Sequence, residues 1–225
     1  MVVNYRGQRE AAEATVAEIG GNAIAVQADV ADADAVARLV GTTLQRLGRI
    51  DVLVNNAGIM HRSDVFHYNP SEAERMWKTN VGGVTNCVAA VAEPMKTQRS
   101  GSIVNLTSIA AHGTAMQGTT FYAATKAAVA ILTKRFALEL GPFGVNVNAV
   151  SPGFIVTDMV AVGRTPEELR QALETLAARA MLGRTGTPED IASVVAFLAS
   201  PDAGFVTGQI LTADGGRTDF LTHGL

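Results

Sequence analysis

Tyr122 and Lys126 stand four residues apart in Tyr-Ala-Ala-Thr-Lys, and Ser108 lies upstream of both. Residues 120–141 carry apolar side chains at three- and four-residue intervals and end in Gly-Pro, which predicts one helix. Positions i and i+4 share a helix face, so the phenol and the ammonium can point into one pocket. A lysine charge within a few ångströms favours the phenolate and lowers the tyrosine pKa from its usual value of ~10. With a serine hydroxyl polarising a carbonyl beside it, this trio suits proton transfer to or from an oxygen.

The same motif also occurs by chance in many helices, where the tyrosine packs at the edge of the core and the lysine is solvated. The elements around the three residues decide between these interpretations. Short runs rich in Val, Ile and Leu alternate with helical segments along the whole chain. The predicted strands cover residues 2–5, 23–28, 52–54, 102–106, 145–150 and 209–212, and the predicted helices cover 8–19, 33–47, 70–98, 120–141, 166–180 and 188–200.

Several of these strands are continuous apolar runs, as expected when helices cover both faces of a sheet. The repeated strand-helix pattern predicts the α/β class, with a doubly wound parallel sheet of the Rossmann type in a single domain over residues 1–225. Ligands of such sheets bind outside the carboxyl ends of the strands. Four segments follow predicted strands directly: Asp29, the turn from Asn55 to Gly58, Ser108, and the loop from Ser151 to Gly153. The candidate chemistry therefore converges on one edge of the sheet.

Composition limits the partners of the chain. Of its 225 residues, 48% are hydrophobic and 17% are charged, with a formal net charge of −3. No cluster of Lys and Arg is present, so nucleic-acid binding is not expected. No apolar run reaches the ~18 residues of a membrane helix and no signal peptide is recognisable, so the sequence predicts a soluble cytoplasmic protein without a membrane partner. Cys87 is the one cysteine and is expected to be a buried thiol, compatible with a reducing cytoplasm.

The four histidines show no metal-ligand spacing, so no metal site is predicted. His61 follows the Asn-Asn-Ala-Gly turn and His112 follows Ser108, so both could line a substrate mouth, although surface histidine is the favoured interpretation. Trp77 is expected to pack within the long helical region. Residues 161–180 carry glycine, proline and charge, and they are interpreted as a mobile lid rather than as core.

Assembled in this order, these residues resemble the short-chain dehydrogenase/reductase family, specifically its branch similar to 3-oxoacyl-acyl-carrier-protein reductases. The turn from Asn55 to Gly58 resembles the family's turn after its fourth strand, and the tail from Thr207 to Gly216 is also typical. The resemblance spans essentially the whole chain. It implies four catalytic positions, which are Asn80, Ser108, Tyr122 and Lys126. It also implies cofactor contacts at Asp29, Val30, Asn56, Ala57, Gly58, Tyr122, Lys126, Pro152, Gly153, Ile155 and Thr157.

The activity that the resemblance implies is hydride transfer between a nicotinamide cofactor and a carbon that bears a carbonyl or secondary alcohol. Candidate substrates are 3-oxoacyl thioesters, sugars and small secondary alcohols. Tyr122 would exchange a proton with the substrate oxygen, and Ser108 would hold that oxygen. Lys126 would lower the phenol pKa and hydrogen-bond the nicotinamide ribose. Asn80 would anchor a water that relays protons to Lys126, whereas taken alone it is typical of a helix-interrupting polar residue bonded to backbone.

The choice of cofactor rests on the first residues of the chain. An acid at the end of the first predicted strand would bond the 2′-hydroxyl of NAD and repel a 2′-phosphate. Here the first carboxylate is Glu10, and Arg6, helped by Arg9, can meet a 2′-phosphate. NADP(H) is therefore favoured over NAD(H), with solvated surface arginines as the open alternative. A second function left open is that of an NAD-dependent sugar or polyol dehydrogenase.

The sequence departs from the family at its start. It contains no glycine-rich turn of the Thr-Gly-x-x-x-Gly-x-Gly kind, whose glycines let the backbone approach a pyrophosphate. In the family the strand before that turn lies between the second and fourth strands, so its loss would leave two neighbours with unpaired backbone groups. Three explanations are open: an internal methionine taken for the start, a truncated chain, or a natural remnant. The last would be a catalytically silent subunit, deficient in cofactor binding.

Two helical segments, the one that carries Cys87 and residues 127–137, are more hydrophobic than a solvent-facing helix requires. The family packs such helices between subunits, so the resemblance implies a homotetramer or dimer. The loop 110–119 is one residue longer than in close relatives, and we expect it to alter substrate shape rather than catalysis.

Overall fold

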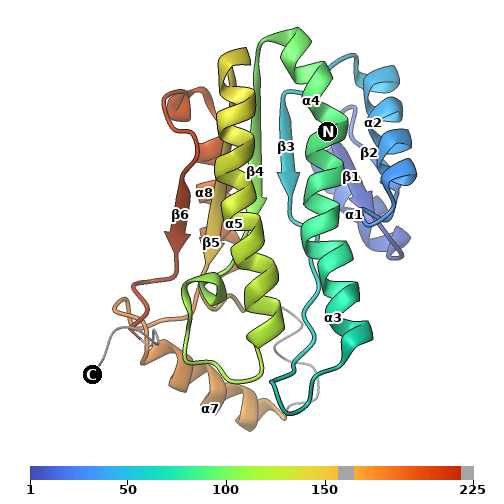
Figure 1. Cartoon of the computed structure of the whole chain (residues 1–225). Coiled ribbons are helices and arrows are strands. Elements are labelled where there is room, and N and C mark those ends of the chain that lie inside the picture. The colour runs from blue at the N-terminus through green and yellow to red at the C-terminus, as the bar shows by residue number, and fades with distance from the viewer. Residues whose placement is uncertain (157–164, 219–225) are drawn as a thin grey trace.

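The computed structural model describes residues 1–156 and 165–218, in which strands and helices alternate (Figure 1). The strands are β1 (Val2–Tyr5), β2 (Ile24–Gln27), β3 (Val52–Asn55), β4 (Gly101–Leu106), β5 (Val145–Pro152) and β6 (Ile210–Ala213). The α-helices are α1 (Arg9–Ile19), α2 (Ala33–Leu47), α3 (Pro70–Met76), α4 (Gly83–Gln98), α5 (Thr120–Leu140), α7 (Pro166–Ala177) and α8 (Pro188–Ala199). A π-helical turn, η1 (Trp77–Gly82), and three 3₁₀ turns, η2 (Ile109–His112), η3 (Gly141–Phe143) and η4 (Pro201–Ala203), complete the described elements.

Every strand pairing is parallel, and the strands form two separate sheets, in the orders β1-β2 and β3-β4-β5-β6. The Rossmann-type α/β fold predicted from the sequence is confirmed. Within residues 1–156 and 165–218, β1 pairs only with β2 and β3 pairs only with β4. Val52 and Val54 of β3 are each 41% exposed, although strands inside a parallel sheet normally bury both faces. The two unpaired strand edges expected from the sequence are therefore present.

Successive side chains of each strand point to opposite faces of the four-stranded sheet, and helices cover both of these faces. On one face, Ile103 and Val147 lie in a core with α4 and α5. On the other face, Val104 and Val150 pack against Leu198 of α8. Figure 1 shows α4 and α5 side by side in front of the strands. This double cover fixes the strands whose carboxyl ends carry the candidate site.

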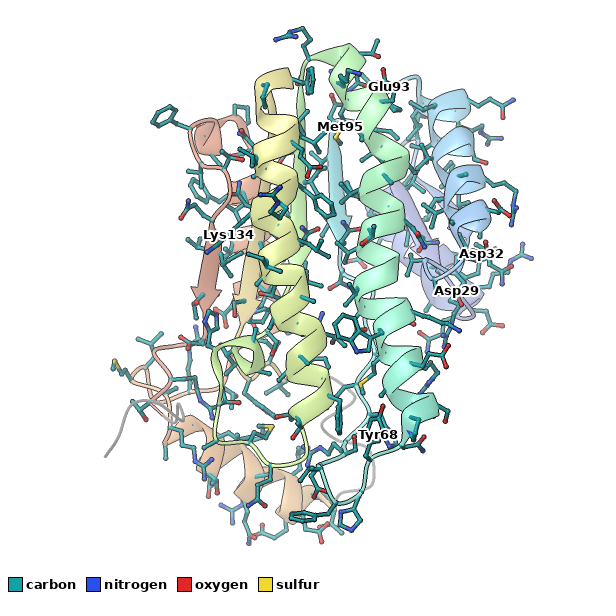
Figure 2. The ribbon with its side chains drawn as sticks, in the orientation of Figure 1. Asp29, Asp32, Tyr68, Glu93, Met95 and Lys134 are labelled. Carbon is teal, nitrogen blue, oxygen red and sulfur yellow. The ribbon has the colours of Figure 1, made fainter. Side chains whose placement is uncertain are left out.

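The sequence predicted a single helix over residues 70–98, but the structure divides it into α3, the π turn η1 and α4. Pro70 begins α3, and the Asn69 side chain caps it by accepting a hydrogen bond from the Glu72 amide at 3.3 Å. The prediction that Trp77 packs within this helix is wrong, because its residue is 44% exposed at the start of the π turn. Met95, by contrast, is fully buried beside β4 on α4 (Figure 2).

The end of β2 is fastened to the start of α4. A Cβ atom added to Gly83 would lie 2.6 Å from Cγ2 of Val30, so only glycine permits this approach. The Asn86 side chain donates a hydrogen bond to the Val30 carbonyl at 2.9 Å. Asp29 and Asp32 lie together at this junction (Figure 2), and Asp32 caps α2 by accepting from two backbone amides. The two-stranded sheet is thus held to the rest of the fold through α2 and α4.

The helix α7 begins with a capping box at Thr165, whereas residues 161–164 of the predicted lid lie outside the described residues. No helix in the described part of the chain is both long and apolar enough to cross a membrane. Among the same residues, no group of three or more His, Cys, Asp or Glu side chains is arranged to hold a metal ion.

Candidate active site

Ser108, Tyr122 and Lys126 come together where β4 ends. Ser108 follows β4 and caps η2, because its hydroxyl accepts a hydrogen bond from the Ala110 amide at 3.2 Å. Tyr122 and Lys126 lie on the first turns of α5, which packs against η2. Lys126 is only 4% exposed. The spacing of Tyr122 and Lys126 on one helix face therefore places both beside the serine that ends the neighbouring strand.

Burial dominates the electrostatics of this trio. Desolvation lowers the pKa of Lys126 from 10.5 to about 8. It also raises the pKa of Tyr122, while the nearby Ser108 side chain acts in the opposite direction. The Lys126 ammonium donates to the Leu106 carbonyl at 2.8 Å and stands 5.8 Å from the centre of the Tyr122 ring. The expected lowering of the phenol pKa is not found in this structure, because desolvation by burial outweighs the opposing effect of Ser108 and raises the Tyr122 pKa.

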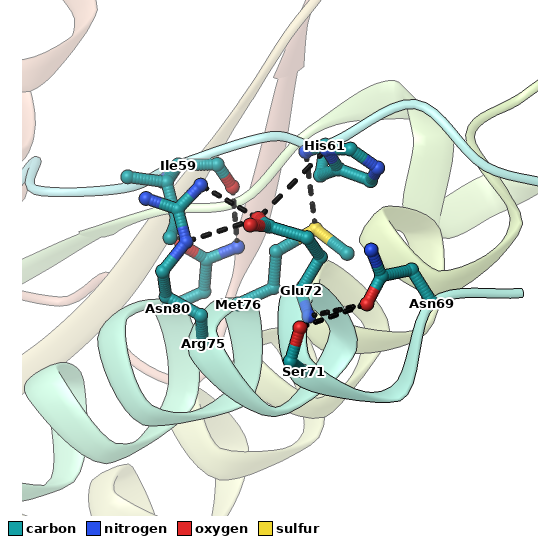
Figure 3. A network of polar contacts seen from close by, with 8 residues as sticks. All are labelled: Ile59, His61, Asn69, Ser71, Glu72, Arg75, Met76 and Asn80. Carbon is teal, nitrogen blue, oxygen red and sulfur yellow. Dashed lines mark hydrogen bonds and ion pairs between the residues drawn. The ribbon is translucent and has the colours of Figure 1, made fainter.

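Asn80 lies inside the π turn and is completely buried. Its carboxamide accepts from the Ile59 amide at 2.8 Å and donates to the Ile59 carbonyl at 2.9 Å (Figure 3). It also donates to the Thr125 hydroxyl at 3.0 Å. Asn80 thus joins the segment after β3 to α5, and π turns of this kind are frequent at functional sites.

The turn after β3 lies directly against these groups. A Cβ atom on Gly58 would stand 3.3 Å from the Lys126 nitrogen and 3.5 Å from Oδ1 of Asn80. Asn56 and Ala57 precede it in the same turn, and Ala57 lines a small pocket with Val30 and Gly83. The turn predicted to touch the cofactor therefore sits between the end of β2 and the buried lysine.

The remaining predicted contacts are spread along the same edge. Asp29 accepts a hydrogen bond from the Ala31 amide at 2.9 Å, which shapes the turn after β2. Arg6 follows β1, is exposed, and forms no ion pair with any described residue. Arg9, named as its helper, is instead paired with Glu13 at 2.7 Å.

The loop after β5 is held against β6. The Gly153 amide donates to the Ala213 carbonyl at 2.9 Å, and a Cβ on Gly153 would lie 2.5 Å from Cα of Asp214. Pro152 pairs with Ala213 in the sheet, and Ile155 bridges to Gly186. Thr157, the last predicted contact of this loop, lies outside the described residues. A cavity of about 220 Å³ adjoins the loop, lined by residues that include Phe154, Ile155 and Arg184. Ser108, Tyr122 and Lys126 do not line that cavity. We therefore place the candidate chemistry at these three side chains and not in the cavity.

The contacts of two polar residues of the site, Thr125 and Ser151, were missed by sequence reasoning. The Thr125 hydroxyl donates to the Tyr122 carbonyl at 2.7 Å and accepts from Asn80. Ser151 lies fully buried at the end of β5, with its hydroxyl 3.1 Å from Nε2 of His112. Neither threonine next to lysine nor serine before proline carries a sequence signal of such contacts.

His61 lies against α3. Its backbone amide lies 3.3 Å from the Met76 sulfur, and its ring stands 3.8 Å from the Glu72 carboxylate, which Arg75 also pairs with (Figure 3). This placement agrees with the surface interpretation of His61 better than with a place at the substrate mouth.

A parallel α/β sheet whose carboxyl edge carries a serine, a tyrosine and a buried lysine defines an oxidoreductase of the Rossmann-fold class. The family model described as enoyl-(acyl carrier protein) reductase matches residues 1–218. The chain belongs to the short-chain dehydrogenase/reductase family.

Its relatives are similar over nearly the whole chain. A 3-oxoacyl-[acyl-carrier-protein] reductase, FabG, from Staphylococcus aureus is 42% identical over 219 residues, which are 96% of this chain and 87% of that protein. The 3-oxoacyl-[acyl-carrier-protein] reductase of Synechocystis is 44% identical over 98% of this chain and 87% of its own length. A gluconate 5-dehydrogenase from Burkholderia cenocepacia, solved with NADP and tartrate, superposes with a TM-score of 0.85 at 32% identity, over 95% of this chain and 83% of that one. The structure of ElxO with NADP bound superposes with a TM-score of 0.86 at 29% identity, over 95% of this chain and 86% of that one.

Proposed function

We propose that this oxidoreductase exchanges a hydride between NADP(H) and a carbonyl or secondary alcohol, with 3-oxoacyl thioesters as the substrate class. The observation that carries the proposal is the buried Lys126 beside Tyr122 and Ser108 at the carboxyl edge of the sheet. Relatives named 3-oxoacyl-[acyl-carrier-protein] reductase support the substrate class. Structural neighbours solved with NADP support the cofactor.

The residues around Lys126 fit the ribose end of a dinucleotide. An ammonium has three N–H donors, and among the described residues Lys126 directs one of them at Leu106. The others can bond ribose hydroxyls beside Gly58, where the absence of a side chain leaves room. Val30 and Ala57 would contact the adenine end, and Arg6 would meet a 2′-phosphate. Asp29, Asn56, Pro152, Gly153, Ile155 and Thr157 complete the proposed cofactor contacts.

The reaction needs one proton at the substrate oxygen when a hydride from the nicotinamide reaches the carbonyl carbon. The Tyr122 hydroxyl is the proposed donor in reduction and acceptor in oxidation. Ser108 would hold the same oxygen by hydrogen bonding as negative charge develops on it. The buried positive charge of Lys126 favours release of the phenol proton once a bound ligand draws the ammonium toward the site. A water relay from Asn80 to Lys126 stays a prediction.

A sugar-acid or polyol dehydrogenase is the second candidate, favoured by one observation, the similarity to the gluconate 5-dehydrogenase. The higher identity to the acyl-carrier-protein reductases favours the first candidate. The third candidate function is that of a catalytically silent subunit, deficient in cofactor binding.

Steady-state assays separate the three candidates. Acetoacetyl-CoA with NADPH, and gluconate with NADP⁺ or NAD⁺, are the substrate pairs, and Tyr122→Phe is the control. Thioester reduction that the control lacks would support the first candidate. Turnover only with gluconate would support the second, and no turnover with any pair would support the third.

The proposal extends to the assembly. We propose that residues 1–225 form one domain, which associates as a homodimer or homotetramer in the cytoplasm. Ile131 and Leu138 of α5 are 57% and 63% exposed, which is more apolar surface than a solvent-facing helix needs. Light scattering of the purified chain tests this proposal, and a monomer at micromolar concentration would contradict it.

A further inference from the structure

A histidine joins the two loops that flank the proposed reaction centre. His112 ends η2, is exposed as a residue, and places Nε2 at 3.1 Å from the hydroxyl of Ser151, in a contact that is itself partly buried. Ser151 is completely buried near the carboxyl end of β5. A buried hydroxyl is costly without a hydrogen-bond partner, and the imidazole supplies one in either tautomer. The contact is therefore a built bridge between η2 and β5.

Each end of this bridge adjoins a proposed functional group. Ser108, which would hold the substrate oxygen, begins the single turn of η2 that His112 ends. Ser151 immediately precedes Pro152 and Gly153, which would contact the cofactor. The bridge thus spans from the substrate side of the site to the cofactor side.

Backbone pairing between the ends of β4 and β5 stops just before η2. The ends of β4 and β5 are joined at Thr107, whose amide and hydroxyl both donate to the Val150 carbonyl, at 2.8 and 2.9 Å. The β4–β5 ladder ends at the Leu106 and Val150 pair, and η2 has internal backbone bonds from Ala111 to Ser108 and from Gly113 to Ala110. The side-chain bridge from His112 continues the fastening of the two strand ends past the point where backbone pairing stops.

We propose that His112 is a positioning residue that acts through Ser151 to fix the Ser108 hydroxyl over the substrate carbonyl. This proposal rests on the proposed function, and His112 itself is not assigned a place in proton transfer. Because reaction rates fall steeply when a reacting group is displaced by about 1 Å, loss of the bridge lowers the turnover rate more than cofactor affinity.

Four variants of the full chain test the bridge. His112→Phe keeps a ring but removes the nitrogen, Ser151→Ala removes the hydroxyl, and the double variant removes both. His112→Gln restores an amide nitrogen at a reach similar to Nε2. His67→Phe is the matched control, because His67 is an exposed histidine paired only locally with Asp64.

We expect His112→Phe and Ser151→Ala each to lower kcat for acetoacetyl-CoA about tenfold, with the Kd for NADPH changed less than twofold. The double variant should lose no more than the worse single variant, because both remove one interaction. His112→Gln should regain most of kcat, and His67→Phe should match the wild type. Losses that multiply in the double variant, or an unchanged kcat in His112→Phe, would overturn the proposal.

Hydrogen exchange keeps this proposal separate from the proposed function. The amides of residues 109–113 should exchange faster in His112→Phe and Ser151→Ala than in wild type or His67→Phe, whether or not the chain is active. Unchanged exchange in that segment would overturn the bridge. An inactive wild type in which exchange does respond would instead overturn the proposed function and leave the structural bridge supported.

Discussion

The Lys126 ammonium is buried, and burial disfavours its positive charge. Its nitrogen is held by the Leu106 carbonyl in a nearly inaccessible position, and burial lowers its pKa to about 8. The same burial raises the pKa of Tyr122. Burial therefore favours the neutral form of both side chains relative to water, although Lys126 still holds its proton below about pH 8, and a ligand that brings negative charge or hydrogen-bond acceptors would stabilise that charge.

Replacing Lys126 by methionine should stabilise the fold below pH 8. Below that pH, Lys126 is protonated in both the folded and the unfolded wild type. The folded protein then carries the full free-energy cost of burying the charged ammonium. Between about 8 and the unfolded value of 10.5, the unfolded state binds more protons, so wild-type stability rises with pH. The advantage of Lys126→Met, roughly 2–3 kcal/mol at most at pH 7, should shrink through this window. Urea unfolding of both proteins at pH 7 and pH 10 measures it, and a difference independent of pH would contradict the assignment.

Removing the Tyr122 hydroxyl should separate chemistry from binding. In any active form of the protein, we expect Tyr122→Phe to lower kcat by about 10²–10⁴-fold, because no other group is assigned to move the proton. NADPH affinity should stay nearly intact, as measured by fluorescence titration. Retained turnover would refute the role given to Tyr122.

At the scale of single elements, the loop after β5 depends on one glycine. A side chain at Gly153 would collide with the backbone at Asp214, at 2.5 Å, which no rotamer change can relieve. We expect Gly153→Ala to destabilise the fold by about 1–3 kcal/mol and to weaken cofactor binding. Gly41→Ala is the matched control, since a Cβ there meets nothing within 4 Å inside α2 and should stabilise by up to about 1 kcal/mol. Equal melting temperatures for the two variants would argue against the close approach.

The order and type of the described elements followed from apolar periodicity and from Gly and Pro at their ends, as with α2 and α5. The π turn could not be predicted in this way, because one extra residue within a long helical segment leaves the apolar pattern of residues 70–98 almost unchanged. The grouping of Ser108, Tyr122 and Lys126 followed from helix spacing and strand ends. The direction of the lysine nitrogen did not, because spacing fixes the face of a helix and not the acceptor, here Leu106, that a long side chain finds.

At the scale of the whole molecule, the sheet is divided between β1 and β3. The 225 residues contain no glycine-rich turn at a helix start, and α1 begins at Arg9 without a side-chain cap at Gln8. Within the described residues, no glycine-rich helix start offers a pyrophosphate the backbone amides that usually hold it. We expect the 225-residue chain to bind NADPH weakly, with a Kd above the micromolar range, so that the assays of the variants need high NADPH concentrations. Fluorescence titration with NADPH, and with NADH alongside, checks this, and saturable micromolar binding would contradict it.

The π turn at Trp77–Gly82 takes up one residue more than an α-helical turn, so the helix is wider around Asn80 while α3 and α4 on either side keep their direction. Deleting the exposed Lys78 would let the segment relax into a continuous α-helix of nearly the same length, with Gly83 still against Val30. The helix content seen by circular dichroism should hardly change, but Asn80 would lose the wide turn from which its carboxamide reaches Ile59. The π turn is thus an insertion that serves the placement of one buried amide.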